Sequence, residues 1–164
     1  MSLKNWNAPG PNFVPAYQIS GIPFVTSSGD TEVGVTAIRV EFPYATRFFT
    51  VENHGDASDK KIRIGFTENG ISASGSSDGA GRWGNNHYYV LPGGERTERI
   101  EVRCKELYIQ LHDQTASYKV GFSVMAGLSQ VPASQFPVIT GSITLTGSRD
   151  QILGSGIPKF EGVG

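Results

Sequence analysis

Apolar and polar residues alternate along most of the middle of the chain. In residues 96–124, Ile100, Val102 and Cys104 alternate with charged residues, and the alternation returns at 107–111 and 118–124. Successive side chains of a β-strand point to opposite faces, so a period of two predicts strands with one buried and one wet face. The helical spacing i, i+3, i+4, i+7 does not recur here. We predict three consecutive strands, around which the rest of the chain is organised.

Similar short runs flank this stretch. Gly21 and Pro23 interrupt the first, which predicts an edge strand or a bulge. An irregular insert is expected at 68–86 and a loop after Gly127. Eight or nine short strands predict an all-β antiparallel β-sandwich, and a single jelly roll fits their number. An immunoglobulin-like sandwich stays open, although its Cys–Trp–Cys pattern is missing. The flanking runs are 17–26, 35–42, 46–52, 61–67, 87–91 and 138–145.

The two ends of the chain have a different composition from its middle. Residues 1–15 hold three prolines without periodicity, and residues 147–164 are rich in glycine. We expect an N-terminal arm at 1–15, a jelly-roll domain at 16–146 and a C-terminal arm at 147–164. Segments that cannot form a core yet carry spaced apolar residues pack on their own domain or on a neighbouring subunit. The candidate assembly contacts are Trp6, Phe13, Ile152, Leu153, Ile157 and Phe160.

Charge and composition exclude several classes of protein. The 14 Lys and Arg residues balance 15 Asp and Glu, which argues against a specific nucleic-acid-binding surface. The 21 glycines and 9 prolines favour turns over helices. The first residues lack the apolar core of a secretory signal, and no apolar run approaches the ~18 residues of a membrane span. We expect a soluble protein made in a reducing compartment.

Catalytic and metal-binding motifs are not evident in the sequence. Cys104 occupies an inward strand position, where a buried structural thiol is expected. His54, His87 and His112 are not accompanied by a His-x-His pair or paired carboxylates. The loop GSSDGAG at 75–81 lacks both the lysine of a phosphate-binding loop and a following helix. We therefore expect no cofactor and no metal site.

Four carboxylates flank predicted strands, namely Asp56, Asp59, Glu68 and Asp113. Two carboxylates across a cleft can hydrolyse a glycosidic bond, so a hydrolase is a third class of function to consider. No acidic pair lies on one strand, however, and solvated loop charges are the simpler interpretation. We expect no catalytic residues and a protein that is not an enzyme.

Three aromatic residues gather beside the long insert: Trp83, Tyr88 and Tyr89. Adjacent strand residues point to opposite faces, so one of the two tyrosines can be exposed. These rings either pack the insert onto the sandwich or form a surface contact with sugar or protein.

Three segments carry a resemblance to a known family: VPAYQISGIPFVTSS at 14–28, RFFTVENHGDASDKKIRIGFTENGI at 47–71 and VLPGGERTERIEVRCKELYIQ at 90–110. Over residues 14–125 the chain resembles the single jelly-roll vertex (penton) and minor capsid proteins of large icosahedral double-stranded DNA viruses that infect algae. The resemblance implies a homopentamer at the fivefold vertices, whose arms contact neighbouring capsid proteins. It implies no cofactor and no active site.

We therefore expect a structural virion protein that is made in the host cytoplasm and whose partners are copies of itself and other capsid proteins. The alternative function is a carbohydrate-binding, lectin-like jelly roll with Trp83, Tyr88 and Tyr89 as its platform. A third possibility, a hydrolase on the same fold, lacks an acidic pair on one strand.

Overall fold

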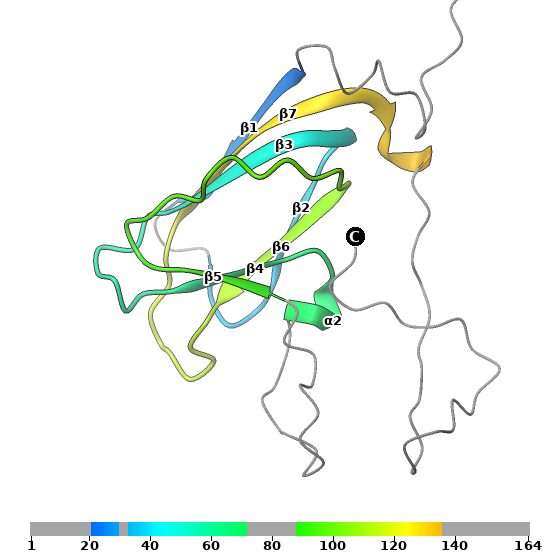
Figure 1. The fold of residues 1–164 in the computed structure, drawn as a ribbon. Coiled ribbons are helices and arrows are strands. Elements are labelled where there is room, and N and C mark those ends of the chain that lie inside the picture. Colours follow the sequence, from blue (N-terminus) through cyan, green and yellow to red (C-terminus); the bar gives the residue numbers. More distant parts are fainter. Residues whose placement is uncertain (1–20, 30–32, 72–87, 136–164) are drawn as a thin grey trace, which may run out of the picture.

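The computed structural model describes residues 21–29, 33–71 and 88–135. Within these ranges, two antiparallel sheets face each other as an all-β sandwich (Figure 1). The first sheet has the order β1-β7-β3, made of β1 (Ile22–Ser27), β7 (Phe122–Pro132) and β3 (Tyr44–Asn53). The second has the order β2-β6-β4-β5, made of β2 (Ile38–Glu41), β6 (Glu106–Leu111), β4 (Ile62–Gly65) and β5 (Tyr88–Leu91). Two short helical turns, α2 (Glu68–Ile71) and η1 (Ala133–Gln135), follow β4 and β7.

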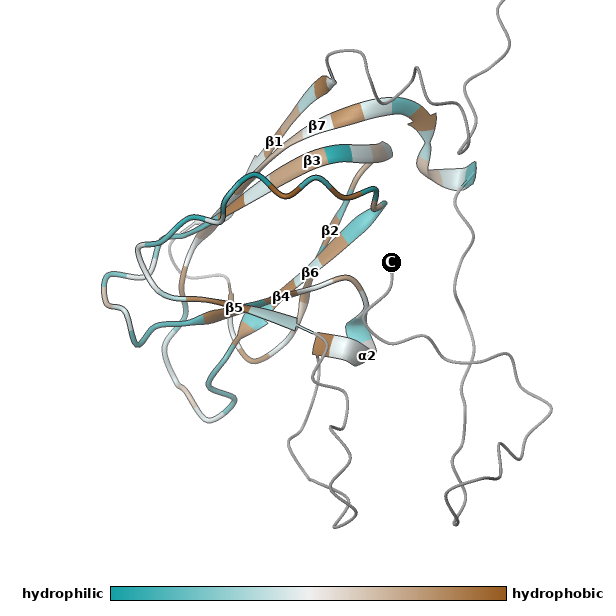
Figure 2. Ribbon diagram, in the orientation of Figure 1, coloured by the Kyte–Doolittle hydropathy of each residue, from teal (hydrophilic) through white to brown (hydrophobic). Residues whose placement is uncertain are grey.

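The core lies between the two sheets and is formed by the inward row of each strand. Hydrophobic stretches (brown) and more hydrophilic ones (white and teal) are interspersed along the strands of both sheets (Figure 2). Phe49 and Val124 of the first sheet and Leu107 and Ile109 of the second are fully buried. Burying one such side chain contributes about 1.5–3 kcal/mol to stability, so this row holds the two sheets together.

The strand pairs are nested along the sequence. β1 pairs with β7, β2 with β6, and β4 with β5, all antiparallel. Inside the β2–β6 pair, β3 contacts residues 96–100 through two antiparallel bridges, Glu52 to Arg96 and Phe49 to Ile100. Successive strands thus pass back and forth between the sheets, and the segment 96–104 runs beside β3 (Figure 1).

The prediction of three consecutive strands in residues 96–124 is wrong for the first of them. β6 is present, and β7 begins at Phe122, but around Ile100 there are only isolated bridges to β3. Side chains replace part of the ladder. Thr97 Oγ1 accepts a hydrogen bond from the Val51 N–H at 2.9 Å, and Thr46 Oγ1 accepts one from the Cys104 N–H at 2.9 Å.

The predicted loop after Gly127 is also wrong, because β7 continues to Pro132. Leu128 and Val131 are buried, and the Ser129 hydroxyl donates a 2.8 Å hydrogen bond to the Ala45 carbonyl. Residues 68–71 of the expected irregular insert form the single turn α2. The other predicted strands within the described ranges are present with shifted ends.

Candidate functional site

The outer face of the first sheet carries a group of exposed apolar side chains. Val25 and Met125 lie opposite each other on β1 and β7, and 71% and 55% of their respective surfaces are exposed. Pro23 and Phe48 belong to the same outward rows, opposite Gly127. We call Pro23, Val25, Phe48 and Met125 the outer apolar face. Exposed apolar groups of this kind mark contact surfaces when they are contiguous.

A glycine on β7 sets the position of the Phe48 ring on this face. A Cβ atom added to Gly127 would overlap the edge of that ring, so the ring lies directly on the β7 backbone. The Arg99 guanidinium covers the ring from outside, 4.1 Å from its centroid. Cation–π stacking of this kind contributes about 0.5–1 kcal/mol at exposed sites. Phe48 is therefore fixed in place and half-buried.

A shallow cleft of 340 Å³ borders the outer apolar face. Phe48, Thr50 and Met125 line it together with Arg96, Thr97, Glu98 and Arg99. Arg99 also forms an ion pair of 2.9 Å with Glu101. Apolar and charged side chains thus meet at this cleft, and both kinds occur at protein contact surfaces.

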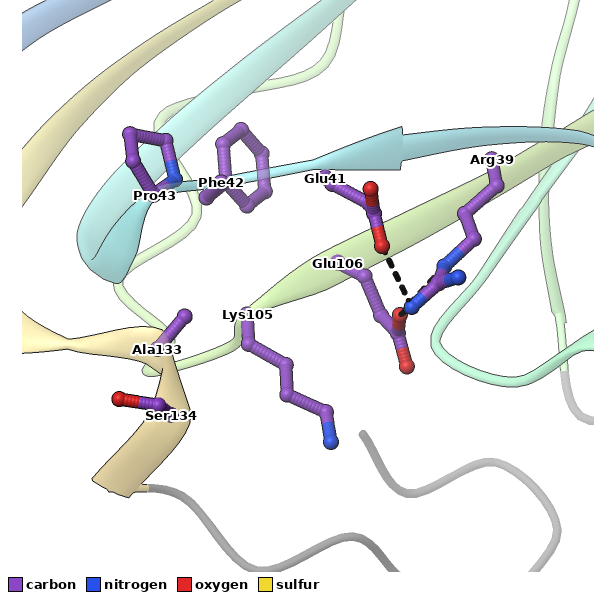
Figure 3. Close-up of a pocket in the computed structure, with 8 residues that line it drawn as sticks. All are labelled: Arg39, Glu41, Phe42, Pro43, Lys105, Glu106, Ala133 and Ser134. Carbon is purple, nitrogen blue, oxygen red and sulfur yellow. Dashed lines mark hydrogen bonds and ion pairs between the residues drawn. The ribbon is translucent and has the colours of Figure 1, made fainter.

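A larger cleft of 510 Å³ lies at one end of the sandwich, between β2, the start of β6 and η1 (Figure 3). Its apolar part comes from Phe42, Pro43 and Ala133, and its polar part includes Lys105 and Ser134. On the charged side, the Arg39 guanidinium contacts Glu41 at 2.7 Å and Glu106 Oε2 through Nε at 2.7 Å. The hydrogen bond to Glu106 raises the pKa of Arg39.

A serine and a histidine that are far apart in sequence meet on the outer surface of the first sheet. Ser123 Oγ lies 3.0 Å from His54 Nε2 and donates to Ser27 Oγ at 3.0 Å. Ser27 in turn donates to the Phe122 carbonyl at 3.2 Å. This network ties β1, β7 and the residue after β3 together on the outer surface.

The buried Arg63 organises the outer side of the second sheet. Its guanidinium donates to the carbonyls of His112 at 2.8 Å and Ile71 at 3.2 Å, and lies 4.5 Å from the Tyr88 ring centroid. Arg63 Nε also donates to His112 Nδ1 at 3.3 Å. Burial, followed by the Arg63 charge, lowers the pKa of His112. His112 is thus held neutral as an acceptor.

The two tyrosines of β5 have different environments. Tyr88 is half-buried against Arg63 and His112, with a ring-to-ring distance of 6.0 Å to the histidine. Tyr89 lies in the inward row opposite Ile64, but β5 is an edge strand, and 58% of Tyr89 is exposed. Trp83, the third member of the predicted platform, lies outside the described residues.

Cys104 is buried, as the alternation predicted. The thiol lies 3.3 Å from Thr46 Oγ1, and burial raises the pKa of Cys104 to about 11. The thiolate is therefore scarce at neutral pH, and Cys104 has a packing role.

The four loop carboxylates are all exposed. Asp56 forms an ion pair of 2.5 Å with Lys60, and Asp113 accepts hydrogen bonds from the N–H and hydroxyl of Thr115 at 2.9 and 2.7 Å. Among the residues that the structure describes, no three His, Cys, Asp or Glu side chains are grouped so that they could hold a metal ion.

Several predicted contacts cannot be placed. The six predicted assembly contacts lie outside the described ranges, namely Trp6, Phe13, Ile152, Leu153, Ile157 and Phe160. His87 and the loop at 75–81 also lie outside them. None of the helices in the described ranges is long and apolar enough to cross a membrane.

Comparison of the chain with family models, with curated proteins and with solved structures gave no match.

Two features of these surfaces were missed in the sequence. The contact between His54 and Ser123 joins residues 69 positions apart, and the Glu41–Arg39–Glu106 group depends on the register between β2 and β6. Neither has a local sequence signal. The exposed Val25–Met125 pair did have a partial signal, because an edge strand interrupted by Pro23 without charged residues leaves apolar side chains uncovered.

Proposed function

We propose that the protein is a structural subunit of jelly-roll type that assembles with copies of itself in a virion. The observation that carries this proposal is the nested strand pairing. Counting the bridged segment 96–100 as the sixth, eight extended segments pair first with eighth, second with seventh, third with sixth and fourth with fifth. This nesting supports the proposal of a jelly roll, a long antiparallel ribbon rolled into two sheets that recurs in viral capsid proteins.

The proposal of self-assembly is supported by the outer apolar face. Val25 and Met125 are uncharged, adjacent and more than half exposed, and Met125 lines the neighbouring cleft together with Arg96 and Arg99. Stable subunit contacts place apolar side chains at the centre and charges at the rim. Together with the resemblance to vertex proteins, this favours a homopentamer at icosahedral vertices in contact with other capsid proteins. The six apolar residues of the two terminal segments would provide additional assembly contacts.

The alternative is a carbohydrate-binding jelly roll that serves attachment, since lectins share the same topology. The observation that favours it is Tyr89, an aromatic side chain with 58% of its surface exposed on an edge strand. Binding on a glycan array that disappears in both Trp83→Ala and Tyr89→Ala would support this function. Loss in neither variant would contradict it.

The absolute mass of the purified full-length chain, measured by light scattering behind a sizing column, tests the main proposal. A discrete pentamer is the expected result. A trimer would keep a shell protein but contradict the vertex position. A chain that stays monomeric over a wide range of concentrations, and in the presence of its candidate shell partners, would contradict self-assembly.

A further inference from the structure

Arg63 on β4 lies where four elements meet on the outer face of the second sheet. Its guanidinium donates to the Ile71 carbonyl of α2 at 3.2 Å and to the His112 carbonyl just after β6 at 2.8 Å. The guanidinium also lies 4.5 Å from the centroid of the Tyr88 ring of β5. Arg63 is only 7% exposed. The position of this one side chain therefore affects how α2 and β5 pack on the sheet.

A neutral imidazole holds the guanidinium in this position. Arg63 Nε donates to His112 Nδ1 at 3.3 Å, and an imidazole nitrogen accepts a hydrogen bond only while it carries no proton. The proton of neutral His112 is therefore on Nε2. When Nδ1 takes up a second proton, this hydrogen bond is lost. Two positive charges then lie next to each other at a half-buried position, where they repel each other more strongly than in bulk water.

The other groups around His112 compensate little for that second charge. Lys61, just before β4, is a further cation, and its carbonyl accepts a 3.0 Å hydrogen bond from the His112 N–H. The Tyr88 ring of β5 faces the imidazole at 6.0 Å between ring centroids and carries no charge at neutral pH. The Asp113 carboxylate favours the protonated imidazole but is exposed. Burial and then the two cations outweigh it, so the pKa of His112 lies below 6.5.

A second acceptor for Arg63 lies directly opposite it on β6. Gln110 and Arg63 are partners in the register between β6 and β4, and side chains at such positions are neighbours on one face of a sheet. Gln110 is 4% exposed, and within the described ranges its buried Oε1 has no hydrogen-bond partner. An unsatisfied buried acceptor is destabilising, so a donor that reaches it is favoured.

The orientation of the Gln110 amide is fixed by its other contacts. Its Nε2 donates to the Val35 carbonyl and, at 3.1 Å, to Gln114 Oε1. A carbonyl oxygen can only accept, so the nitrogen of the amide must lie on that side. Exchange of the two amide atoms would place Oε1 against the Val35 carbonyl, and Oε1 therefore remains the available acceptor.

We propose that Arg63 and His112 form a pH-sensitive switch, in which protonation of His112 transfers the Arg63 guanidinium from His112 Nδ1 to Gln110 Oε1. β4 lies between β6 and β5, so a shift toward Gln110 is a shift away from Tyr88. The cation–π contact with Tyr88 is then weakened. Tyr88 begins the edge strand β5, and this edge of the second sheet becomes looser in acid. The exchange takes place within one copy of the chain, so it does not depend on self-assembly.

Two crystal structures of the full-length protein, one above and one below the titration midpoint of His112, test the exchange directly. Nuclear magnetic resonance of the ¹⁵N-labelled imidazole gives this midpoint. We expect the neutral structure to keep the contact of Arg63 Nε with His112 Nδ1. The acidic structure should place a guanidinium nitrogen within about 3.2 Å of Gln110 Oε1. Identical guanidinium contacts on both sides of the midpoint would overturn the proposal.

Two variants distinguish a switch from a glutamine with a purely structural role. Gln110→Met removes Oε1, the acceptor of the protonated state, so the proton affinity of His112 should fall by roughly threefold or more, the scale of one hydrogen bond. Gln114→Met is the matched control, because it removes a contact of Gln110 Nε2 but keeps Oε1, and the midpoint of His112 should stay the same. An unchanged midpoint in Gln110→Met, or an equal shift in both variants, would contradict the exchange. If Gln110→Met does not fold, the two structures decide the question.

Hydrogen exchange of the backbone amides of β5 measures the loosening of this edge. Rates are compared with those of an unstructured peptide at the same pH, which gives a protection factor for each amide. Protection of β5 should fall by roughly threefold or more when His112 is protonated, the scale of the Tyr88 contact. In His112→Gln, which takes up no proton, protection should stay constant. The same loss in His112→Gln, or no loss in the native chain, would contradict the release of Tyr88.

Discussion

Glu41 and Glu106 lie directly opposite each other on β2 and β6, and Arg39 contacts both carboxylates. Like charges at directly opposed positions of an antiparallel pair destabilise the sheet. A single guanidinium on the neighbouring outward position of β2 removes that repulsion. The ion pairs of Arg39 with Glu41 and Glu106 thus support the register between the edge strand β2 and β6, beside the 510 Å³ cleft.

Arg39→Gln should therefore destabilise the fold by about 0.5–1 kcal/mol, since exposed ion pairs are weak but the variant also restores the repulsion. The free energy of unfolding in urea at low salt measures the change. The double variant Arg39→Gln/Glu106→Gln should recover most of the loss, because only one carboxylate then remains. A double variant that is less stable than the single one would contradict this account.

Gly127→Ala should lower stability by about 1–3 kcal/mol, the usual effect of overpacking. The added methyl group would overlap the Phe48 ring, which Arg99 holds from outside. Gly34→Ala is the matched control, since its Cβ would lie 3.8 Å from the Lys119 side chain, an ordinary contact. Thermal unfolding of both variants measures the difference. Adding Phe48→Leu should partly rescue Gly127→Ala, and absence of rescue would argue against the ring as the cause.

The stability of the fold should fall between pH 7.5 and pH 5 because of His112. Its pKa in the folded chain lies below the ordinary value of 6.5. At a pH between the pKa of His112 in the folded chain and 6.5, the imidazole is protonated in the unfolded chain and neutral in the folded one. Acidification through this range therefore favours unfolding. His112→Gln should reduce the difference in unfolding free energy between the two pH values.

Cys104 should be unreactive in the native protein. Its thiol is buried, and burial raises its pKa to about 11, so both access and thiolate are lacking at pH 8. With Ellman's reagent, one thiol per chain should react within minutes in denaturant, and native protein should react at least a hundredfold more slowly. Equally fast reaction in native protein would mean that the edge beside Thr46 opens readily.

Deletion of residues 1–15 should leave a folded sandwich and weaken its assembly. The core cluster of the described residues runs from Phe24 to Leu128, and the deletion leaves all of it in place. Circular dichroism and the urea midpoint report on the fold, and light scattering reports on assembly. Trp6→Ala/Phe13→Ala in the full chain tests the two apolar residues without a truncation. Unfolding of the shortened chain would contradict an assembly role for this segment.

The strict alternation of residues 107–111 correctly predicted β6, and the runs around Ile38 and Ile62 predicted β2 and β4. In each case one face of the strand is buried on the opposite sheet, so pattern and environment agree. The same alternation around Ile100 predicted a continuous strand that is not present. There Ile100 and Cys104 pack against the core, whereas Val102 is exposed. Threonine hydroxyls from both segments replace backbone groups of the ladder, and an alternating pattern does not show which hydrogen-bond partner a strand will have.

The prediction of a loop after Gly127 was wrong for the opposite reason, because a segment without alternation forms the end of β7. Ser129 and Pro132 suggested a loop, yet the Ser129 hydroxyl is satisfied by the Ala45 carbonyl, and Pro132 closes the strand. The candidate contact surfaces were harder to predict than the strands. They depend on which strands become neighbours, such as Val25 with Met125, and a hundred residues of intervening chain separate the two.

The nesting of strands has a consequence for how the chain reaches its fold. β7 is the central strand of its sheet, although it is the last strand described, and its partner residues on β1 lie about a hundred positions earlier. Pairing over such separations requires loop closure before any contact forms, which slows folding. During synthesis, β1 and β3 cannot join into one sheet until β7, which pairs with both, has left the ribosome. Folding is therefore expected to be late and highly cooperative, with the N-terminal half open to chaperones until the final strand arrives.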